Sequence, residues 1–237
     1  PRFVRASMGV MLASGGFGAT ELRGWFVEQA VARGLRVEAD GLGNVVAWWD
    51  PAPGLSEDVA DRPAVLTGSH LDSVLDGGAY DGPLGVVSAL AAVDVLRSRG
   101  FVPSRRLGVS VFAEEEGSRF GLACLGSRLV TGATSWETAR SLTDRDGVSF
   151  EDALGAAGLD GSALSLAGVG TFVELHVEQG RDLVDRGAAV GVASGIWPHG
   201  RYRFDFTGEA NHAGTTRMED RADPMLADRY DWLSPAI

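Results

Sequence analysis

Residues 64–73 read AVLTGSHLDS, a short apolar run that ends in a histidine and an aspartate. The apolar part is typical of a buried β-strand. Similar runs predict strands at 107–113 (LGVSVFA), 172–175 (FVEL) and 188–193 (AAVGVA). Between the run that starts at residue 64 and the run at 107–113, an apolar segment begins with Pro83 and is followed by Gly100. This segment predicts a helix over about 83–99. This alternation of strand and helix indicates an α/β domain with a largely parallel sheet.

The flanking regions extend this domain on one side and indicate a second domain on the other. The spacing of apolar residues predicts a helix over 20–32, and 35–39 with 44–49 read as strand, turn and strand. In RYRFDF (201–206), aromatic residues alternate with charged ones. That alternation predicts a strand with one wet face, as in an antiparallel sheet. We therefore assign 1–197 to the first domain and 198–237 to the start of a second.

The composition excludes several classes of function. The 237 residues include 21 basic and 32 acidic side chains, for a formal net charge of −11, which argues against a nucleic-acid or anionic-membrane surface. There is no lysine, so a Schiff-base lysine and a P-loop lysine are excluded. Cys124 is the single cysteine. It cannot form an intrachain disulfide, and we expect it to be a small core residue.

The sequence shows no membrane or export signal. The most apolar stretch, 84–96, is interrupted by Ser88 and Asp94 and is shorter than the roughly 18 residues that a membrane span requires. The first residues lack a basic region followed by an apolar one. We therefore expect a cytoplasmic protein with no membrane partner.

Polar side chains follow the predicted strands at the points where they end. His70 and Asp72 follow the first strand, three glutamates at 114–116 follow the second, His176 follows the third, and Asp81 precedes the helix start. Because ligands of open α/β sheets gather beyond the carboxyl ends of the strands, we expect these side chains to meet at one rim. Histidine and carboxylate without thiolate are the ligands of a hydrolytic Zn²⁺ or Mn²⁺ site. The alternatives are a surface histidine, a solvated acidic face, and a simple turn at Asp81.

Two competing chemistries find no support in the sequence. No G-x-S-x-G motif is present, so a serine nucleophile of the α/β-hydrolase kind is not indicated. Gly41-Leu-Gly43 is not followed by the third glycine of a dinucleotide-binding loop.

Five motifs occur in an order that closely resembles one family. They are 68–73 (GSHLDS), 77–85 (GGAYDGPLG), 115–120 (EEGSRF), 174–180 (ELHVEQG) and 211–216 (NHAGTT). Together they resemble the amidase and ureidohydrolase branch of the aminoacylase/carboxypeptidase-type di-metal hydrolases. This branch includes allantoate amidohydrolase, N-carbamoyl-L-amino-acid hydrolase and β-ureidopropionase. The resemblance implies an α/β, mainly parallel-sheet di-metal hydrolase catalytic domain, followed by the beginning of an α+β lid and dimerisation domain.

The resemblance also implies a set of metal ligands. By position, His70, Asp81 and His176 match the ligands of one divalent ion, and Asp81 matches the bridge to a second ion that Glu116 also binds. The implied cofactors are two divalent ions, Mn²⁺ or Zn²⁺, between which the sequence does not choose. A bridging carboxylate of this kind holds two ions about 3.5–4 Å apart.

Further positions match residues that act in catalysis or substrate binding. Glu115 matches the general base, and Asp72 matches the carboxylate that orients a histidine ligand. His212 matches a histidine that crosses a dimer interface and stabilises the oxyanion. Gln179 and Arg201 match positions that hold the ureido and carboxylate ends of the substrate, and their alternative is an ordinary surface polar residue.

The resemblance gives three expectations about function. The preferred one is hydrolysis of the ureido C–N bond of allantoate, with release of ammonia and CO₂, by a homodimer formed through the lid domain. The second is hydrolysis of N-carbamoyl-L-amino acids. The third is a truncated, inactive remnant that only binds metal, because the family's chain continues well beyond 221–225 and supplies there the last histidine of the second metal site.

Overall fold

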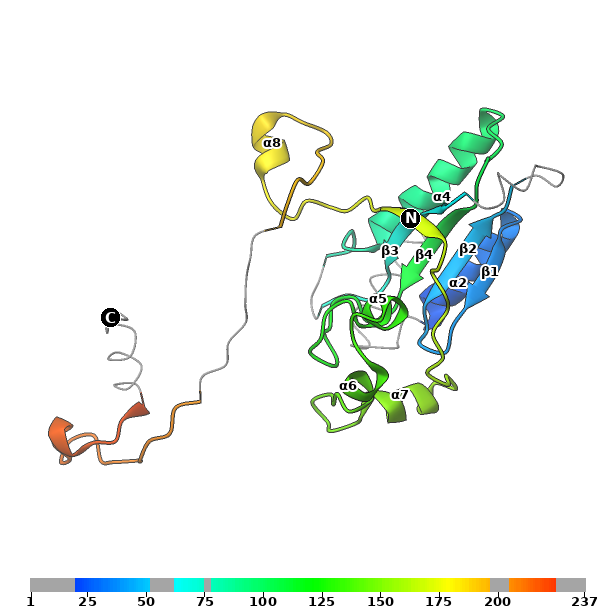
Figure 1. Ribbon diagram of the computed structural model, residues 1–237. Coiled ribbons are helices and arrows are strands. Elements are labelled where there is room, and N and C mark those ends of the chain that lie inside the picture. The colour runs from blue at the N-terminus through cyan, green and yellow to red at the C-terminus, as the bar shows by residue number, and fades with distance from the viewer. Residues whose placement is uncertain (1–19, 52–61, 75–77, 197–204, 225–237) are drawn as a thin grey trace. The chain divides into compact units, whose positions relative to one another are not determined.

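A five-stranded mixed sheet forms the centre of the first part of the chain (Figure 1). The computed structural model describes residues 20–51, 62–74, 78–196 and 205–224. The sheet has the order β1-β2-β4-β3-β5. Its strands are β1 (Arg36–Ala39), β2 (Val45–Trp49), β3 (Ala64–His70), β4 (Leu107–Phe112) and β5 (Val169–Val173).

The strand directions confirm the predicted, mainly parallel sheet. β3 runs parallel to both of its neighbours, β4 and β5. β2 is antiparallel to β1 and to β4, so it is the one strand that runs against the others. Because β3 has a parallel neighbour on each side, the carboxyl ends of β4, β3 and β5 lie at the same edge.

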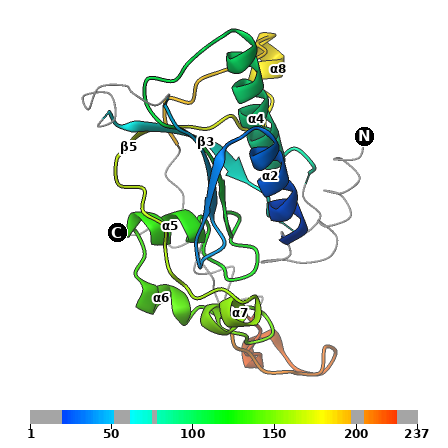
Figure 2. The same ribbon diagram turned by 90° about the vertical axis from the view of Figure 1, so that its right-hand side faces the viewer.

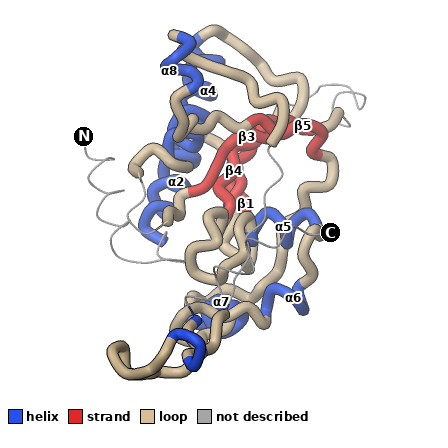
Figure 3. Tube along the Cα trace, turned by 90° about the vertical axis from the view of Figure 1, so that its left-hand side faces the viewer, coloured by secondary structure: helices blue, strands red, loops and turns tan. Residues whose placement is uncertain are grey.

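Two helices cover one face of this sheet. α2 (Thr20–Ala32) and α4 (Pro83–Ser98) lie together on that side in Figures 2 and 3, and both confirm helices predicted from the sequence. Phe26 of α2 and Val86 of α4 are fully buried in the same apolar cluster as Val109 and Val111 of β4. Burial of apolar area in this layer supplies the main driving force for folding.

The other face of the sheet is covered by different segments. Trp48 and Leu66 pack there against Leu166, which precedes β5, and Val169, the first residue of β5. α5 (Leu125–Thr131) lies on this side in Figure 3. With α6 (Trp136–Arg140) and α7 (Phe150–Ala156), it surrounds a separate apolar cluster around Phe120 and Phe150.

Two predicted strands need correction. The run 172–175 belongs to a strand that starts three residues earlier and ends at Val173, because pairing with β3 sets its limits. The strand predicted over 188–193 is wrong: these residues have no regular secondary structure, and Val190 and Val192 are exposed. Their apolar character favours a strand, but a strand forms only where a neighbouring strand pairs with it. Most of the strand predicted over 201–206 lies outside the described residues.

The chain divides into two compact units, 1–181 and 182–237. The first holds the sheet. In the described part of the second are α8 (Asp182–Arg186) and a short 3₁₀ helix (Met218–Asp220). The predicted domains 1–197 and 198–237 remain a prediction. Within the described ranges, no helix combines the length and the apolarity that crossing a bilayer demands.

Candidate metal site

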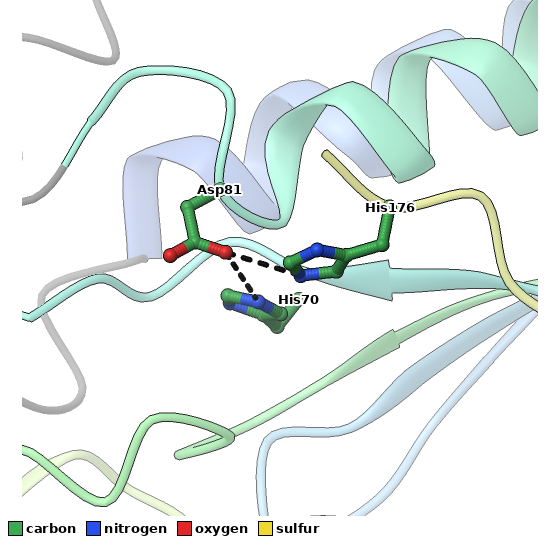
Figure 4. A group of neighbouring side chains, drawn as sticks. All are labelled: His70, Asp81 and His176. Atoms are coloured by element: carbon green, nitrogen blue, oxygen red, sulfur yellow. Dashed lines mark ion pairs between the residues drawn. The ribbon is translucent and has the colours of Figure 1, made fainter. Parts of the chain in front are cut away.

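Three segments that are distant in the sequence bring an aspartate between two histidines (Figure 4). His70 is the last residue of β3, Asp81 lies two residues before α4, and His176 lies three residues beyond β5. Oδ1 of Asp81 lies 3.1 Å from Nε2 of His176 and 3.8 Å from Nε2 of His70. The side chains expected to meet at the rim of the sheet therefore do so.

Backbone carbonyls fix the orientation of both imidazole rings. Nδ1 of His70 lies 2.9 Å from the carbonyl oxygen of Asp72, and Nδ1 of His176 lies 2.8 Å from that of Val177. Because a carbonyl only accepts, each Nδ1 carries the proton and donates it. In a neutral ring, Nε2 then keeps its lone pair and points toward Asp81, which is the orientation that a metal ligand needs.

Two glycines make this close arrangement possible. Gly82 has φ +77°, and a Cβ there would lie 2.6 Å from the imidazole and the carbonyl oxygen of His70. At Gly85, in the first turn of α4, a Cβ would lie 2.4 Å from the carbonyl oxygen of Leu175. The absence of side chains at these positions lets the start of α4 pack against the segments that carry both histidines.

Two glutamates after β4 complete a second group of candidate ligands. His70, Glu115 and Glu116 each offer one ligand atom within 4.8 Å of the others, as do His70, Asp81 and His176. Oε2 of Glu115 lies 3.4 Å from Nε2 of His70. Burial, reinforced by the neighbouring charge of Asp81, raises the pKa of Glu116 to about 7. A nearby cation would favour its charged form.

The buried polar atoms of this region fit a divalent cation. Among the described residues, the buried side-chain atoms without a hydrogen-bond partner are Nε2 of His70, Oδ1 of Asp72 and Oε1 of Glu116. Leaving such atoms unpaired costs free energy. Nε2 of His70 and Oε1 of Glu116 belong to the groups of candidate ligands and can face a hard or borderline cation. Oδ1 of Asp72 lies on the Nδ1 side of the His70 ring instead.

Asp72 and Gln179 contact the candidate ligands directly. The carboxylate of Asp72 lies 3.6 Å from Nδ1 of His70, and its Oδ2 accepts a hydrogen bond of 3.0 Å from the backbone N–H of Glu116. Gln179, which has φ +55°, donates from Nε2 to Oδ2 of Asp81. Gln179 was expected to bind substrate, and here it holds the oxygen of Asp81 that does not face the histidines.

The two remaining predicted residues lie in the second unit. The exposed His212 accepts a hydrogen bond of 3.1 Å at Nδ1 from the backbone N–H of Gly214. Arg201 is outside the described residues. The catalytic, metal-binding and substrate-binding roles of all nine predicted residues remain predictions.

Sequence reasoning did not predict the contacts of three residues that shape this region. Asn44 is fully buried, and its Oδ1 accepts from the backbone N–H of Ala113, next to the glutamates. Oε1 of the buried Glu114 accepts from the backbone N–H of Arg119, and burial raises the pKa of Glu114. Sγ of Cys124 lies 3.3 Å from Oε1 of Glu115. Only the folded structure reveals these contacts, because nothing in the local sequence distinguishes Glu114 from its two neighbours.

Cys124 lies at the wall of a cavity rather than in the core as expected. The cavity has a volume of about 540 Å³ and lies between α5 and β5. Its lining includes Glu115, Ser69 and Glu174 together with the apolar side chains of Leu66 and Phe172. Burial, aided by the charge of Glu115, raises the pKa of the Cys124 thiol to about 11.

Comparison with known proteins connects this geometry to one group of enzymes. Residues 44–153 match the model of peptidase family M28. The chain is 40% identical over 204 residues to a ureidoglycolate hydrolase of Arabidopsis thaliana, with 82% of this chain and 42% of the relative covered. It is also 40% identical over 200 residues to an N-carbamoyl-L-amino acid amidohydrolase of Geobacillus stearothermophilus, with 82% and 47% covered. These matches bear out the resemblance of the chain's five motifs to the amidase and ureidohydrolase branch.

Two further matches agree with this family. An allantoate amidohydrolase of Escherichia coli is 37% identical over 205 residues, with 85% of this chain and 48% of the relative covered. A crystal structure of a hydantoinase/carbamoylase family amidase from Burkholderia ambifaria superimposes with a TM-score of 0.69 at 30% identity, covering 96% of this chain and 57% of that one. The chain thus spans less than half the length of these curated relatives of the amidase family. This similarity indicates divalent-metal binding, for which the residues around His70 are candidate ligands.

Proposed function

We propose that the protein hydrolyses the ureido C–N bond of a small substrate with the help of divalent metal ions. The observation that carries this proposal is the carboxylate of Asp81, which lies between Nε2 of His70 and Nε2 of His176. His70, Asp81 and His176 would hold one ion, and Glu116 with Asp81 a second. At such a site, Mn²⁺ or Zn²⁺ supplies Lewis-acid polarisation of a carbonyl group.

The chain's own groups account for movement of the proton. Glu115 contacts His70 through one carboxylate oxygen and Cys124 through the other, and its side chain is 35% exposed. It is therefore oriented and still within reach of water. In the proposed role, Glu115 accepts a proton from the attacking water and passes it to the nitrogen that leaves.

Allantoate is the proposed substrate. The reaction consumes one water molecule and releases ammonia and CO₂. Among the relatives described above, the names ureidoglycolate hydrolase, allantoate amidohydrolase and N-carbamoyl-L-amino acid amidohydrolase all denote action on a ureido or carbamoyl group. N-carbamoyl-L-amino acids are the second candidate, favoured by the 40% identity to the Geobacillus stearothermophilus protein. Substrate contacts by Gln179 and Arg201, and oxyanion stabilisation by His212, belong to the same proposal. A cytoplasmic location and a homodimer through 198–237 stay predictions from the sequence.

The test is an ammonia-release assay of the purified chain with Mn²⁺ or Zn²⁺. Allantoate, ureidoglycolate and an N-carbamoyl-L-amino acid are compared as substrates, and metal content is measured in the same samples. Turnover of allantoate supports the proposal, and exclusive turnover of the carbamoyl compound supports the second candidate. Bound metal with no turnover of any of the three identifies a chain that binds metal without activity of its own.

A further inference from the structure

A side-chain hydrogen bond joins the two strand ends that carry the histidines. Oγ of Ser69 donates to Oε1 of Glu174 across 2.5 Å. Ser69 directly precedes His70, and Glu174 lies two residues before His176. Because its acceptor is a carboxylate oxygen, this hydrogen bond belongs to the stronger, charge-assisted class.

The position of this hydrogen bond is informative because the backbone pairing of the strands stops short of it. The register of β3 and β5 runs from Ala64↔Val169 to Thr67↔Val173. Glu174 lies one residue past the last pair, and His176 lies three residues past it. The pairing therefore fixes β5 but not the segment that places His176, and the Ser69–Glu174 hydrogen bond is the first link beyond it.

The start of α4 also packs against the place where Ser69 and Glu174 join the ends of β3 and β5. A Cβ at Gly85 would lie 2.4 Å from the carbonyl oxygen of Leu175 and 2.8 Å from Cβ of Ser69. The first turn of α4 thus packs directly on Ser69 and on Leu175, the residue after Glu174, and Gly85 lies four residues after Asp81. The segments that carry His70, Asp81 and His176 therefore meet at Ser69, which is 2% exposed.

We infer that Ser69 and Glu174 form a positioning pair that holds His176 within ligand distance of Asp81 and His70. The inference rests on the proposed metal site and adds a determinant of its affinity. Neither group of closely spaced candidate ligands in the described residues includes Glu174. Glu174 therefore acts by holding the segment that carries His176, and not as a ligand in those groups.

The experiment measures Mn²⁺ affinity of the full chain by isothermal titration calorimetry, without substrate. Ser69→Ala and Glu174→Ala each remove the hydrogen bond, and each is expected to weaken binding about tenfold, the lower end of the range for residues that orient metal ligands. Glu174→Gln keeps an oxygen acceptor and is expected to restore most of the affinity. The double variant Ser69→Ala/Glu174→Ala should lose no more than either single variant, since both remove one shared interaction.

Ser73→Ala is the matched control, because the Ser73 hydroxyl contacts only the adjacent carbonyl of Val74 among the hydrogen bonds found for it. It should leave the Mn²⁺ affinity unchanged. Thermal unfolding of each metal-free variant shows whether weaker Mn²⁺ binding comes from a displaced His176 in a folded chain or from unfolding of the chain. If Ser69→Ala does not fold, the comparison of Glu174→Ala with Glu174→Gln carries the test.

Three negative outcomes are possible, and they have two different meanings. Wild-type protein that binds Mn²⁺, with folded alanine variants that bind it equally well, overturns the positioning role alone. Additive losses in the double variant also overturn it. A folded wild-type chain that takes up neither Mn²⁺ nor Zn²⁺ overturns the proposed function and the positioning role together.

Discussion

Nδ1 of His70 lies 2.9 Å from the backbone carbonyl oxygen of Asp72 and 3.6 Å from the carboxylate of the same residue. The main chain of Asp72 therefore holds the ring in hydrogen-bond geometry, while its side chain contributes charge at a longer distance. The same carboxylate accepts from the backbone N–H of Glu116. Asp72 thus links the end of β3 to the loop that carries the glutamates.

Asp72→Asn should weaken metal binding only moderately. The carbonyl contact that orients His70 survives, and an amide oxygen can still accept from Glu116, so only the negative charge is lost. We expect an affinity for Mn²⁺ about tenfold lower, measured by calorimetry, whereas His70→Ala should abolish binding at the site. Equal losses in both variants would contradict this division of roles.

Glu115→Gln and Glu116→Gln should have opposite signatures. Glu115 is the proposed proton carrier, so Glu115→Gln is expected to reduce ammonia release by at least 100-fold with metal content preserved. Glu116→Gln should instead lower the amount of bound metal. Both quantities are measured on the same preparations, by assay and by elemental analysis. Loss of metal from Glu115→Gln with retention in Glu116→Gln would reverse the two assignments.

The Cys124 thiol should react slowly and in a strongly pH-dependent way. Burial and the charge of Glu115 raise its pKa to about 11, and only the thiolate is nucleophilic. A raised pKa means less thiolate at any pH below it, so alkylation by iodoacetamide is expected to be slow at pH 8 and to accelerate as the pH approaches 11. Mass spectrometry reads this directly because the chain has one cysteine.

Two variants check the cause of this slow alkylation. Glu115→Gln removes the neighbouring charge and should speed the reaction at pH 8, and unfolding in urea should speed it further. A folded protein alkylated at pH 8 as fast as the urea-unfolded chain would show that the thiol is not perturbed.

Gly85→Ala should destabilise the protein although the residue lies in a helix. An alanine in an open helical position is favoured over glycine by about 1 kcal/mol. At Gly85, however, the new Cβ would meet the carbonyl oxygen of Leu175 at 2.4 Å, and such overpacking costs about 1–3 kcal/mol. Urea denaturation should therefore show a lower free energy of unfolding.

Gly24→Ala provides the matched control in α2, since nothing lies within 4 Å of the Cβ position there. It should raise the free energy of unfolding by about 1 kcal/mol. A stabilising Gly85→Ala would show that α4 does not approach the strand ends as closely as described.

Elements with a clear local pattern could be predicted from the sequence, and those that depend on a distant partner could not. Periodicity and the flanking Pro83 and Gly100 located α4, and apolar runs located β3 and β4. The similar run at 188–193 forms no strand. The prediction failed because an apolar run does not show whether another strand pairs with it. The limits of β5 likewise come from its pairing with β3.

The same distinction applies to the candidate site. The meeting of His70, Asp81 and His176 was predictable because the ends of parallel strands share one edge of a sheet. The hydrogen bond from Gln179 to Asp81 and the contact between Cys124 and Glu115 were not. They depend on backbone conformations, such as the positive φ of Gln179 and of Cys124, that no periodic pattern encodes.

In the described part of the chain, β5 lies at the edge of the sheet and pairs with β3 alone, about a hundred residues away in the sequence. His176 reaches Asp81 only while that pairing holds. Local opening of an edge strand costs less than global unfolding, so separation of β5 would disperse the three ligands while the rest of the sheet stays intact. The rate at which a bound ion escapes would then be set by strand opening, and amide hydrogen exchange in 169–173 would slow when the ion is added.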